Sequence, residues 1–152
     1  MPVMTDVEQK TREFLKLHWN GAMLGEVQLP GSWASYNLKG AVPNGDRQGC
    51  YALVRDGVVI YIGLAASRGG GLYKEHGIGA RLSAHVLSWD RSIQVDVSGR
   101  VYSPRKKWAG ITEICTYGFP PGYGYMAGSL EAYLISVLEP RENVIKTSSN
   151  SG

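Results

Sequence analysis

Arg81 and His85 lie one helical turn apart in a segment whose apolar residues recur at helical spacing. That spacing predicts a helix whose buried stripe is formed by Ile78, Leu82, Val86 and Trp89. The guanidinium and the imidazole share or border this stripe, and a charge turned toward a core needs partners, because an unpaired buried charge is very costly. The pair is therefore either a structural histidine beside an arginine whose head reaches water, or the floor of a cleft.

Two tyrosines lie in the clearest hairpin of the sequence, residues 50–62. A two-residue Asp-Gly loop would turn Tyr51 and Tyr61 to opposite faces. A three-residue Arg-Asp-Gly loop with a bulge instead pairs Val54 with Val58 and sets the two phenols opposite each other. We prefer this register because it collects apolar side chains on the other face, namely Val54, Val58, Ile60 and Ile62. A cross-strand aromatic pair can also serve stability alone, by up to about 1 kcal/mol.

Glu131 supplies a carboxylate in a later segment with helical spacing. Ser129 is the predicted N-terminal cap of that helix, which puts Glu131 in the first turn, where the helix dipole stabilises a negative charge. The same carboxylate at the rim of an open site would suit Mg²⁺ or Mn²⁺, because magnesium takes one or two carboxylates and keeps most of its water ligands. Glu131 alone leaves both explanations open.

In their order along the chain, these residues resemble the GIY-YIG nuclease family. The elements that carry the resemblance are Gly49-Cys50-Tyr51, Tyr61-Ile62-Gly63, Arg81 with His85, Glu131, and Asn143 after Leu138-Glu139-Pro140. They span about residues 49–146, two thirds of the chain, and residues 1–48 lie outside the family core. Cys50 stands where the family motif has isoleucine. The glycine-rich residues 64–77 lengthen the gap before Arg81 and offer room for a specialised contact.

The resemblance implies hydrolysis of phosphodiester bonds in DNA at a single divalent metal ion, Mg²⁺ or Mn²⁺. By this likeness, Glu131 holds the metal ion and Arg81 binds the phosphate as negative charge builds on its oxygens. Tyr51 is the general base that activates water, which a phenol does only when a nearby cation lowers its pKa. His85 accepts the proton of Tyr51. Tyr61 orients the water or the phosphate, and the two tyrosines can exchange roles.

The same likeness gives Asn143 a bracing role behind the site. A basic cluster follows the second predicted helix and consists of Arg105, Lys106 and Lys107. Alone it is a solvated loop, but beside a nuclease site it becomes an arm that contacts phosphates. Arg68 and Lys74, in the glycine-rich segment, are further candidates for DNA contact.

We therefore expect an endonuclease that cuts double-stranded DNA, similar to the small restriction enzymes of the family. Cutting both strands of a palindrome would favour a two-fold homodimer. The same chemistry would serve a secreted antibacterial effector or a phage-borne nuclease. A non-catalytic DNA-binding module is the alternative of another class, and the intact set of tyrosines, arginine, histidine and glutamate argues against it.

The elements that must position these residues follow the order α-β-β-α-β-α. A capping box at Thr5 and Glu8 begins a helix that runs to about Trp19. The other predicted segments are an irregular stretch at 20–48, a helix at 78–89, a weak strand at 93–102, an exposed basic loop at 103–107, a strand at 111–117 and a helix that Pro140 ends. The fold class is therefore α+β, with helices flanking a small antiparallel sheet of about three strands.

The composition bounds the class of protein. The chain has 152 residues, of which 43% are hydrophobic and 19% charged, so we expect one globular domain with a disordered tail at 148–152. No apolar run approaches the roughly 18 residues of a spanning helix, and two cysteines are too few for a disulfide scaffold. We expect a cytoplasmic protein, secreted only if it is an effector, with no membrane partner. The net charge of +3 is compatible with DNA as the partner.

Overall fold

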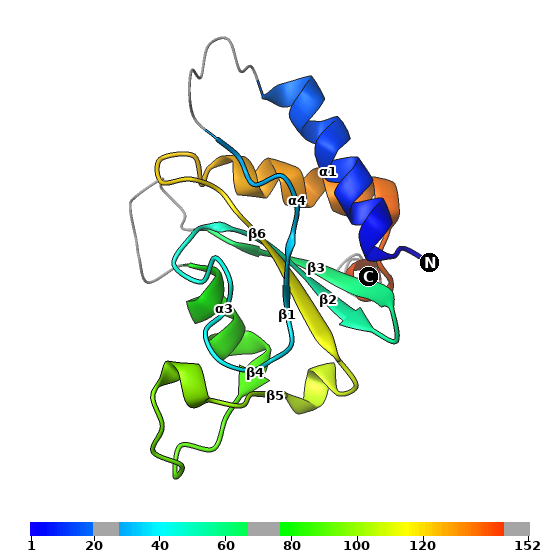
Figure 1. Ribbon diagram of the computed structural model, residues 1–152. Coiled ribbons are helices and arrows are strands. Elements are labelled where there is room, and N and C mark those ends of the chain that lie inside the picture. The colour runs from blue at the N-terminus through cyan, green and yellow to red at the C-terminus, as the bar shows by residue number, and fades with distance from the viewer. Residues whose placement is uncertain (20–27, 67–76, 145–152) are drawn as a thin grey trace, which may run out of the picture.

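Four strands of the part of the chain that the structure describes, residues 1–19, 28–66 and 77–144 of a computed structural model, form one antiparallel sheet in the order β1-β6-β2-β3 (Figure 1). Their bounds are Ala34–Tyr36 for β1, Gly49–Arg55 for β2, Val58–Ala65 for β3 and Glu113–Gly118 for β6. The expected α+β class is confirmed. The sheet has one strand more than expected, because β1 is too short to show an alternating pattern within the stretch assigned as irregular.

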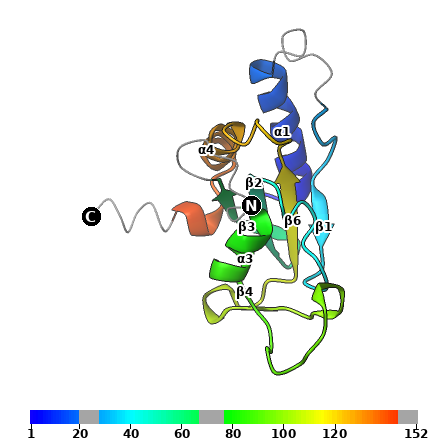
Figure 2. The same cartoon turned by 90° about the vertical axis from the view of Figure 1, so that its left-hand side faces the viewer.

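Helices cover both faces of this sheet (Figures 1 and 2). Their bounds are Met4–His18 for α1, Ile78–His85 for α3 and Met126–Leu138 for α4, and the short strands β4 and β5 cover Leu87–Ser88 and Ser103–Pro104. α1 and α4 pack on one face, over a core that includes Phe14 and Leu130. α3 packs on the other face with β4, over Leu53 and Ile114. No described helix has the length and apolar character needed to cross a membrane.

The first helix begins after Val3, whose backbone N–H donates a hydrogen bond to the Asp6 carboxylate at 2.8 Å. The expected N-terminal helix is confirmed, but the capping box predicted at Thr5 and Glu8 is wrong. The Glu8 carboxylate instead accepts a hydrogen bond from the backbone N–H of Trp33 at 2.8 Å. This contact fastens the segment before β1 to α1, which is why the missed strand lies against the sheet.

The second helix is shorter than its apolar spacing predicts. It ends at His85, and Leu87 leaves the helix to form β4 while it stays in the core. The guanidinium of Arg105 satisfies the helix end, because it donates to the carbonyl oxygens of Ser83 at 2.7 Å and of Leu87 at 3.0 Å. A contact from far along the chain thus ends a helix that the local pattern would continue.

The strand predicted at residues 93–102 is wrong. Residues 89–102 instead form an arm between β4 and β5, with a 3₁₀ turn at Val97–Gly99. Within the arm, the carboxylates of Asp90 and Asp96 accept hydrogen bonds from donors two or three residues ahead, on Ser92, Ser98 and Gly99. Such local bonds compete with a strand ladder. The arm projects at the end of the molecule away from α1 (Figures 1 and 2).

The last helix begins at Met126, three residues before the predicted cap Ser129. A backbone turn leads directly into Met126, so the helix starts before Ser129. Ser129 is a helical residue with an exposed side chain and not the cap. Glu131 therefore lies in the second turn and not in the first, where the helix dipole acts most strongly. The helix ends at Leu138, and the C-cap residue Glu139, with a φ of 47°, turns the backbone into the left-handed region.

The outer edge of β3 is covered by two distant parts of the chain. The backbone N–H of Val59 donates to the carbonyl oxygen of Pro2 at 2.9 Å. Farther along the strand, the side chain of Asn143, in a helical turn at 141–144, bonds both backbone groups of Ile62 at 2.9 Å. The edge strand is thereby paired on its open side at two positions.

Candidate active site

The turn of the β2–β3 hairpin is a two-residue loop and not the three-residue loop that we preferred. Asp56 and Gly57 are both left-handed, with φ of 52° and 76°. An Asp-Gly pair in this conformation matches the right-handed twist of a hairpin. Val54 therefore pairs with Val59, and the predicted pairing with Val58 is wrong.

A β-bulge beyond the turn brings the two phenols to the same face. The pairing shifts between Leu53 and Val54, so that Tyr61 lies opposite Leu53 and Gly63 lies opposite Tyr51. The ring centroids of Tyr51 and Tyr61 are 6.3 Å apart, and the ring planes are inclined at 42°. The face with two phenols is present although the two residues do not pair directly. The apolar face differs from the predicted one and consists of Cys50, Ala52, Val54, Val59 and Ile62.

Tyr51 lies over a glycine of the neighbouring strand. The tyrosine is only 3% exposed. A Cβ at Gly63 would overlap ring carbons and the hydroxyl oxygen of Tyr51, so only glycine leaves room for the ring. Gly63, of the Tyr61-Ile62-Gly63 motif, thus leaves the space that the ring of Tyr51 occupies.

Close backbone contacts place α3 against the loop that precedes β2. The backbone N–H groups of Ile78 and Gly79 donate to the carbonyl oxygens of Arg47 and Gly45, both at 2.9 Å. A Cβ at Gly77 would lie 2.5 Å from the Gly45 oxygen, so a larger residue could not start the helix here. These contacts determine where α3 begins and therefore where the residues of its next turn lie.

Burial raises the pKa of the Tyr51 hydroxyl well above its ordinary value, and Tyr61 raises it further. Arg81 opposes this effect, because its charge and a hydrogen bond between its guanidinium and the Tyr51 hydroxyl lower the pKa. The charge of Glu131 adds a smaller increase in the pKa of Tyr51. The balance leaves the phenol protonated at neutral pH.

Tyr61 responds to the same two charges. Burial raises the pKa of this half-buried tyrosine, the charge of Glu131 raises it further, and the charge of Arg81 lowers it. Two phenols that respond to one carboxylate and one guanidinium must lie within reach of both. The structure therefore brings four predicted residues into one electrostatic group from β2, β3, α3 and α4, namely Tyr51, Tyr61, Arg81 and Glu131.

Glu131 reaches this group from the helix on the other face of the sheet. Its side chain is half-buried, and, after burial itself, its charge is a further cause that raises the pKa of the Cys50 thiol. A carboxylate offers the hard oxygen ligands that Mg²⁺ prefers. Within residues 1–19, 28–66 and 77–144, no group of three or more His, Cys, Asp or Glu side chains is placed to hold a metal ion. A divalent cation at Glu131 would therefore have fewer than three such ligands from the described residues, and water and substrate oxygens would complete its coordination.

His85 and Asn143 hold different positions around this group. His85 is the last residue of α3, one turn beyond Arg81, and its side chain is exposed. The Asn143 side chain is buried, and its amide accepts a hydrogen bond from the Ile62 N–H and donates one to the Ile62 carbonyl oxygen. Ile62 is the residue between Tyr61 and Gly63, so Asn143 holds the backbone that carries both.

The basic cluster divides into residues with different surroundings. Arg105 donates to the end of α3, as described above, while the Lys106 side chain is exposed. The Lys107 ammonium lies 5.2 Å from the centre of the Trp108 ring. The expected loop at 103–107 includes β5 and the start of a 3₁₀ turn at Lys106–Trp108. The other DNA-contact candidates and the predicted tail fall outside the described residues: Arg68, Lys74 and residues 148–152.

Trp108 is a neighbour of the site that the sequence analysis does not include. Its ring centroid is 4.9 Å from that of Tyr61, and it packs in the same buried cluster as Tyr51. The tryptophan therefore contacts both Tyr61 and Lys107. Its signal in the sequence is an aromatic residue directly after three cations, which does not distinguish a site residue from a core residue.

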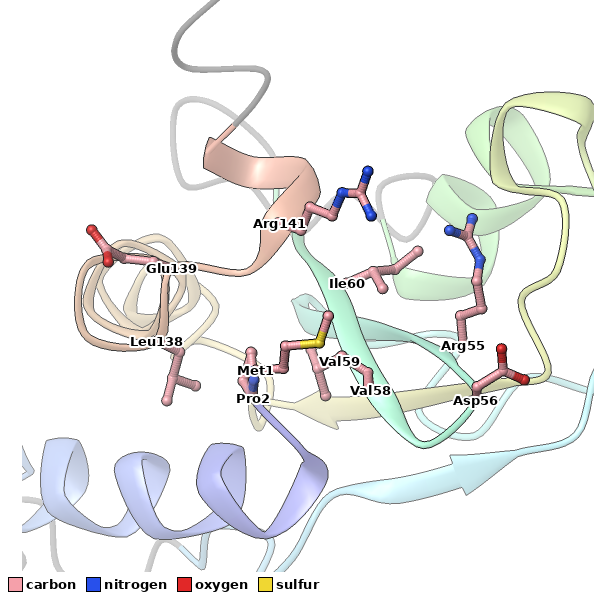
Figure 3. A pocket seen from close by; sticks show the side chains of 10 residues that line it. All are labelled: Met1, Pro2, Arg55, Asp56, Val58, Val59, Ile60, Leu138, Glu139 and Arg141. Carbon is pink, nitrogen blue, oxygen red and sulfur yellow. The ribbon is translucent and has the colours of Figure 1, made fainter.

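An open groove of about 510 Å³ lies at the turn end of the hairpin (Figure 3). Apolar side chains that include Met1, Val58 and Leu138 line it, with the guanidinium groups of Arg55 and Arg141 beside them. None of the six catalytic candidates lines this groove. The groove and the candidate site are therefore separate places.

Comparison with known proteins gives no match: no protein-family model, no curated protein and no solved structure is similar to this chain.

Proposed function

We propose that the chain is a divalent-metal-dependent endonuclease that hydrolyses phosphodiester bonds and cuts both strands of DNA as a restriction enzyme does. The observation that carries this proposal is the electrostatic group in which two phenols, one guanidinium and one carboxylate meet from four separate elements. A protein that only needed stability would have little reason to place a guanidinium and a carboxylate within electrostatic reach of two phenols. Phosphodiester hydrolysis uses each of them.

Arg81 is the group that binds the scissile phosphate. Its guanidinium has five N–H donors, more than the hydrogen bond to Tyr51 uses, and it can bind phosphate oxygens in a planar, bidentate arrangement. The side chain is also exposed, so a polymeric substrate can reach it. Donors already in place stabilise the charge that builds on the phosphate in the transition state.

The two phenols orient the attacking water and accept its proton. Tyr51 is held rigidly over Gly63, whereas Tyr61 is half-buried and open to solvent on one side. The raised pKa of each keeps both phenols protonated in the free protein. Either phenol becomes a base only when positive charge near Glu131 outweighs that carboxylate, and exposed His85, one turn from Arg81, then receives the proton.

Glu131 is the residue that would hold Mg²⁺ or Mn²⁺. When bound, such an ion polarises the phosphate and stabilises the leaving oxygen. The carboxylate lies within electrostatic reach of both phenols, so a cation there would reverse the sign of the charge that they experience. Asn143 would support the site through the backbone of Ile62.

Duplex DNA is the proposed partner, with exposed Lys106 and Lys107 among the phosphate contacts. The described part of the chain provides one such electrostatic group, so cleavage of both strands at a palindrome would use two copies related by a two-fold axis.

Incubation with supercoiled plasmid tests this function directly. The wild-type chain is expected to cut in Mg²⁺ and to be inactive in EDTA, and Glu131→Gln is expected to be inactive in both. Glu139→Gln, which removes an exposed carboxylate eight residues later in the chain, is the matched control and should cut normally. Discrete ends on sequencing identify a restriction-type enzyme, and random ends identify an effector or phage nuclease. Binding without cleavage would identify a non-catalytic module and overturn the proposal.

A further inference from the structure

The arm, residues 89–102, projects from the fold and is held at its base by backbone hydrogen bonds. Its return end is tied to a separate segment, since Tyr102 N–H donates to Leu38 and Gly40 N–H donates to the Arg100 carbonyl oxygen, both at 2.8 Å. The side chains of residues 91–99 are nevertheless all exposed. The fold thus holds the base of the arm and presents its tip to solvent.

Two arginines of the arm stack on one tryptophan. The guanidinium carbon of Arg100 lies 4.2 Å from the centre of the Trp89 ring, and that of Arg91 lies 5.6 Å from it. A guanidinium stacked on an indole keeps its planar N–H donors at the edge, where they can bind an anion bidentately. The stacking also limits the side-chain freedom that binding would otherwise remove.

The tip of the arm is apolar. Ile93, Val95 and Val97, here called the apolar tip, are 56%, 41% and 43% exposed. Single exposed aliphatic residues are ordinary. Three of them within five residues of one projection give it an exposed apolar character that suits a partner.

The arm together with the basic cluster that follows it carries a net positive charge. Residues 87–108 contain five Lys or Arg residues and two Asp residues, a net charge of +3, which equals that of the whole chain. The rest of the chain is therefore neutral overall. Within residues 89–102 two arginines balance two aspartates, so the excess charge comes from Arg105, Lys106 and Lys107, which follow the arm in the chain. This neighbouring charge would attract a polyanion.

From these observations we propose that the arm grips duplex DNA: Arg91 and Arg100 bind backbone phosphates, and the apolar tip contacts sugars and base edges in a groove. The inference rests on the proposed DNA substrate and assigns a binding element to residues outside the candidate active site. Phosphate contacts would set the position of the arm, and apolar contacts with thymine methyl groups or sugars would add affinity that does not depend on salt.

The first test measures binding to a pool of random duplex DNA in EDTA, at a series of salt concentrations. Each lost phosphate contact lowers the slope of log affinity against log salt by about 0.9. Arg91→Ala with Arg100→Ala should therefore flatten the slope by one to two units, roughly, while thermal unfolding shows the variant to be folded. Arg12→Ala, an exposed arginine on α1, is the matched control and should keep the slope.

The second test replaces the apolar tip by serine at all three positions. Affinity should fall about tenfold with an unchanged salt slope, because apolar contacts and no charges are removed. Leu17→Ser, at a 69% exposed leucine of α1, is the control.

The outcomes separate the two proposals. DNA binding that is the same in the wild type and both arm variants overturns the role of the arm and leaves the nuclease function standing. A wild type that binds no DNA overturns both. A serine-tip variant that sediments as a monomer where the wild type is a dimer, with DNA affinity intact, would make the arm an interface between copies and overturn the inference.

Discussion

The ring of Tyr51 fills the space that a side chain on Gly63 would occupy. The two residues are direct partners across β2 and β3. The tyrosine of one motif is therefore positioned by the absence of a side chain in the other.

Gly63→Ala should displace the Tyr51 ring. We expect a cost of about 1–3 kcal/mol in the free energy of unfolding, as in other overpacked cores. Cleavage should fall about 100-fold, because a displacement of a catalytic group by 1 Å has that order of effect. Plasmid cleavage and urea denaturation measure the two. Gly31→Ala, where a Cβ would meet no atom within 4 Å, is the control. Normal cleavage by Gly63→Ala would show that cleavage does not depend on the position of the Tyr51 ring over Gly63.

Glu131→Gln should lower the pH at which Tyr61 titrates. The carboxylate charge raises the pKa of Tyr61 because it repels the phenolate, so removal of that charge lowers the pKa. Arg81→Gln should raise it for the opposite reason. Ultraviolet absorbance of the phenolate against pH, with Tyr61→Phe to assign the transition, measures both shifts. Equal titrations in all three proteins would show that the charges do not reach Tyr61.

Asn143→Ala should destabilise the fold by about 2 kcal/mol, because the N–H and carbonyl groups of Ile62 both lose a partner. Asn143→Asp keeps the acceptor for the N–H but puts a carboxylate against the Ile62 carbonyl oxygen in a buried site, so at neutral pH a cost at least as large as that of Asn143→Ala is expected. Urea denaturation with an unchanged m-value reports the difference. A cost near zero for Asn143→Ala would mean that water replaces the amide without loss.

Arg105 should differ from the two lysines that follow it. Arg105→Ala removes donors to the carbonyl oxygens of Ser83 and Leu87, so we expect a loss of about 1 kcal/mol in stability. Lys106→Ser with Lys107→Ser should leave stability unchanged and flatten the salt slope of DNA binding by about two units. Thermal unfolding and salt titrations of binding separate the effects. A flatter salt slope without loss of stability in Arg105→Ala would instead show that Arg105 contacts DNA.

The local pattern predicted the elements that carry the motifs but not their register. An Asp-Gly pair between two β-rich runs indicates a hairpin, and that hairpin is present. The bulge beside Leu53 has no signature, because it depends on which of several apolar residues the sheet leaves unpaired. Both phenols lie on one face as expected, but because of the bulge and not because Tyr51 pairs directly with Tyr61.

Long-range contacts account for the other differences. The apolar spacing of residues 78–89 predicts a longer helix, whereas Arg105, distant in the sequence, binds the carbonyl groups at the end of the observed one. The hydrogen bond between Glu8 and Trp33 also joins two segments that share no sequence pattern. The meeting of Arg81 and Glu131 with the phenols likewise requires both faces of the sheet to be assembled. From the sequence, only the likeness to a family suggested that Arg81, Glu131 and the phenols would lie near one another.

The covered edge of β3 has a consequence for handling the protein. An unpaired strand edge is a template for intermolecular sheet formation, and here Pro2 and Asn143 occupy that edge from the two ends of the described chain. Shortening the chain at either end would uncover backbone donors and acceptors of β3. The contacts of Pro2 and Asn143 therefore protect this edge against aggregation, and expression tags or truncations should leave both of them intact.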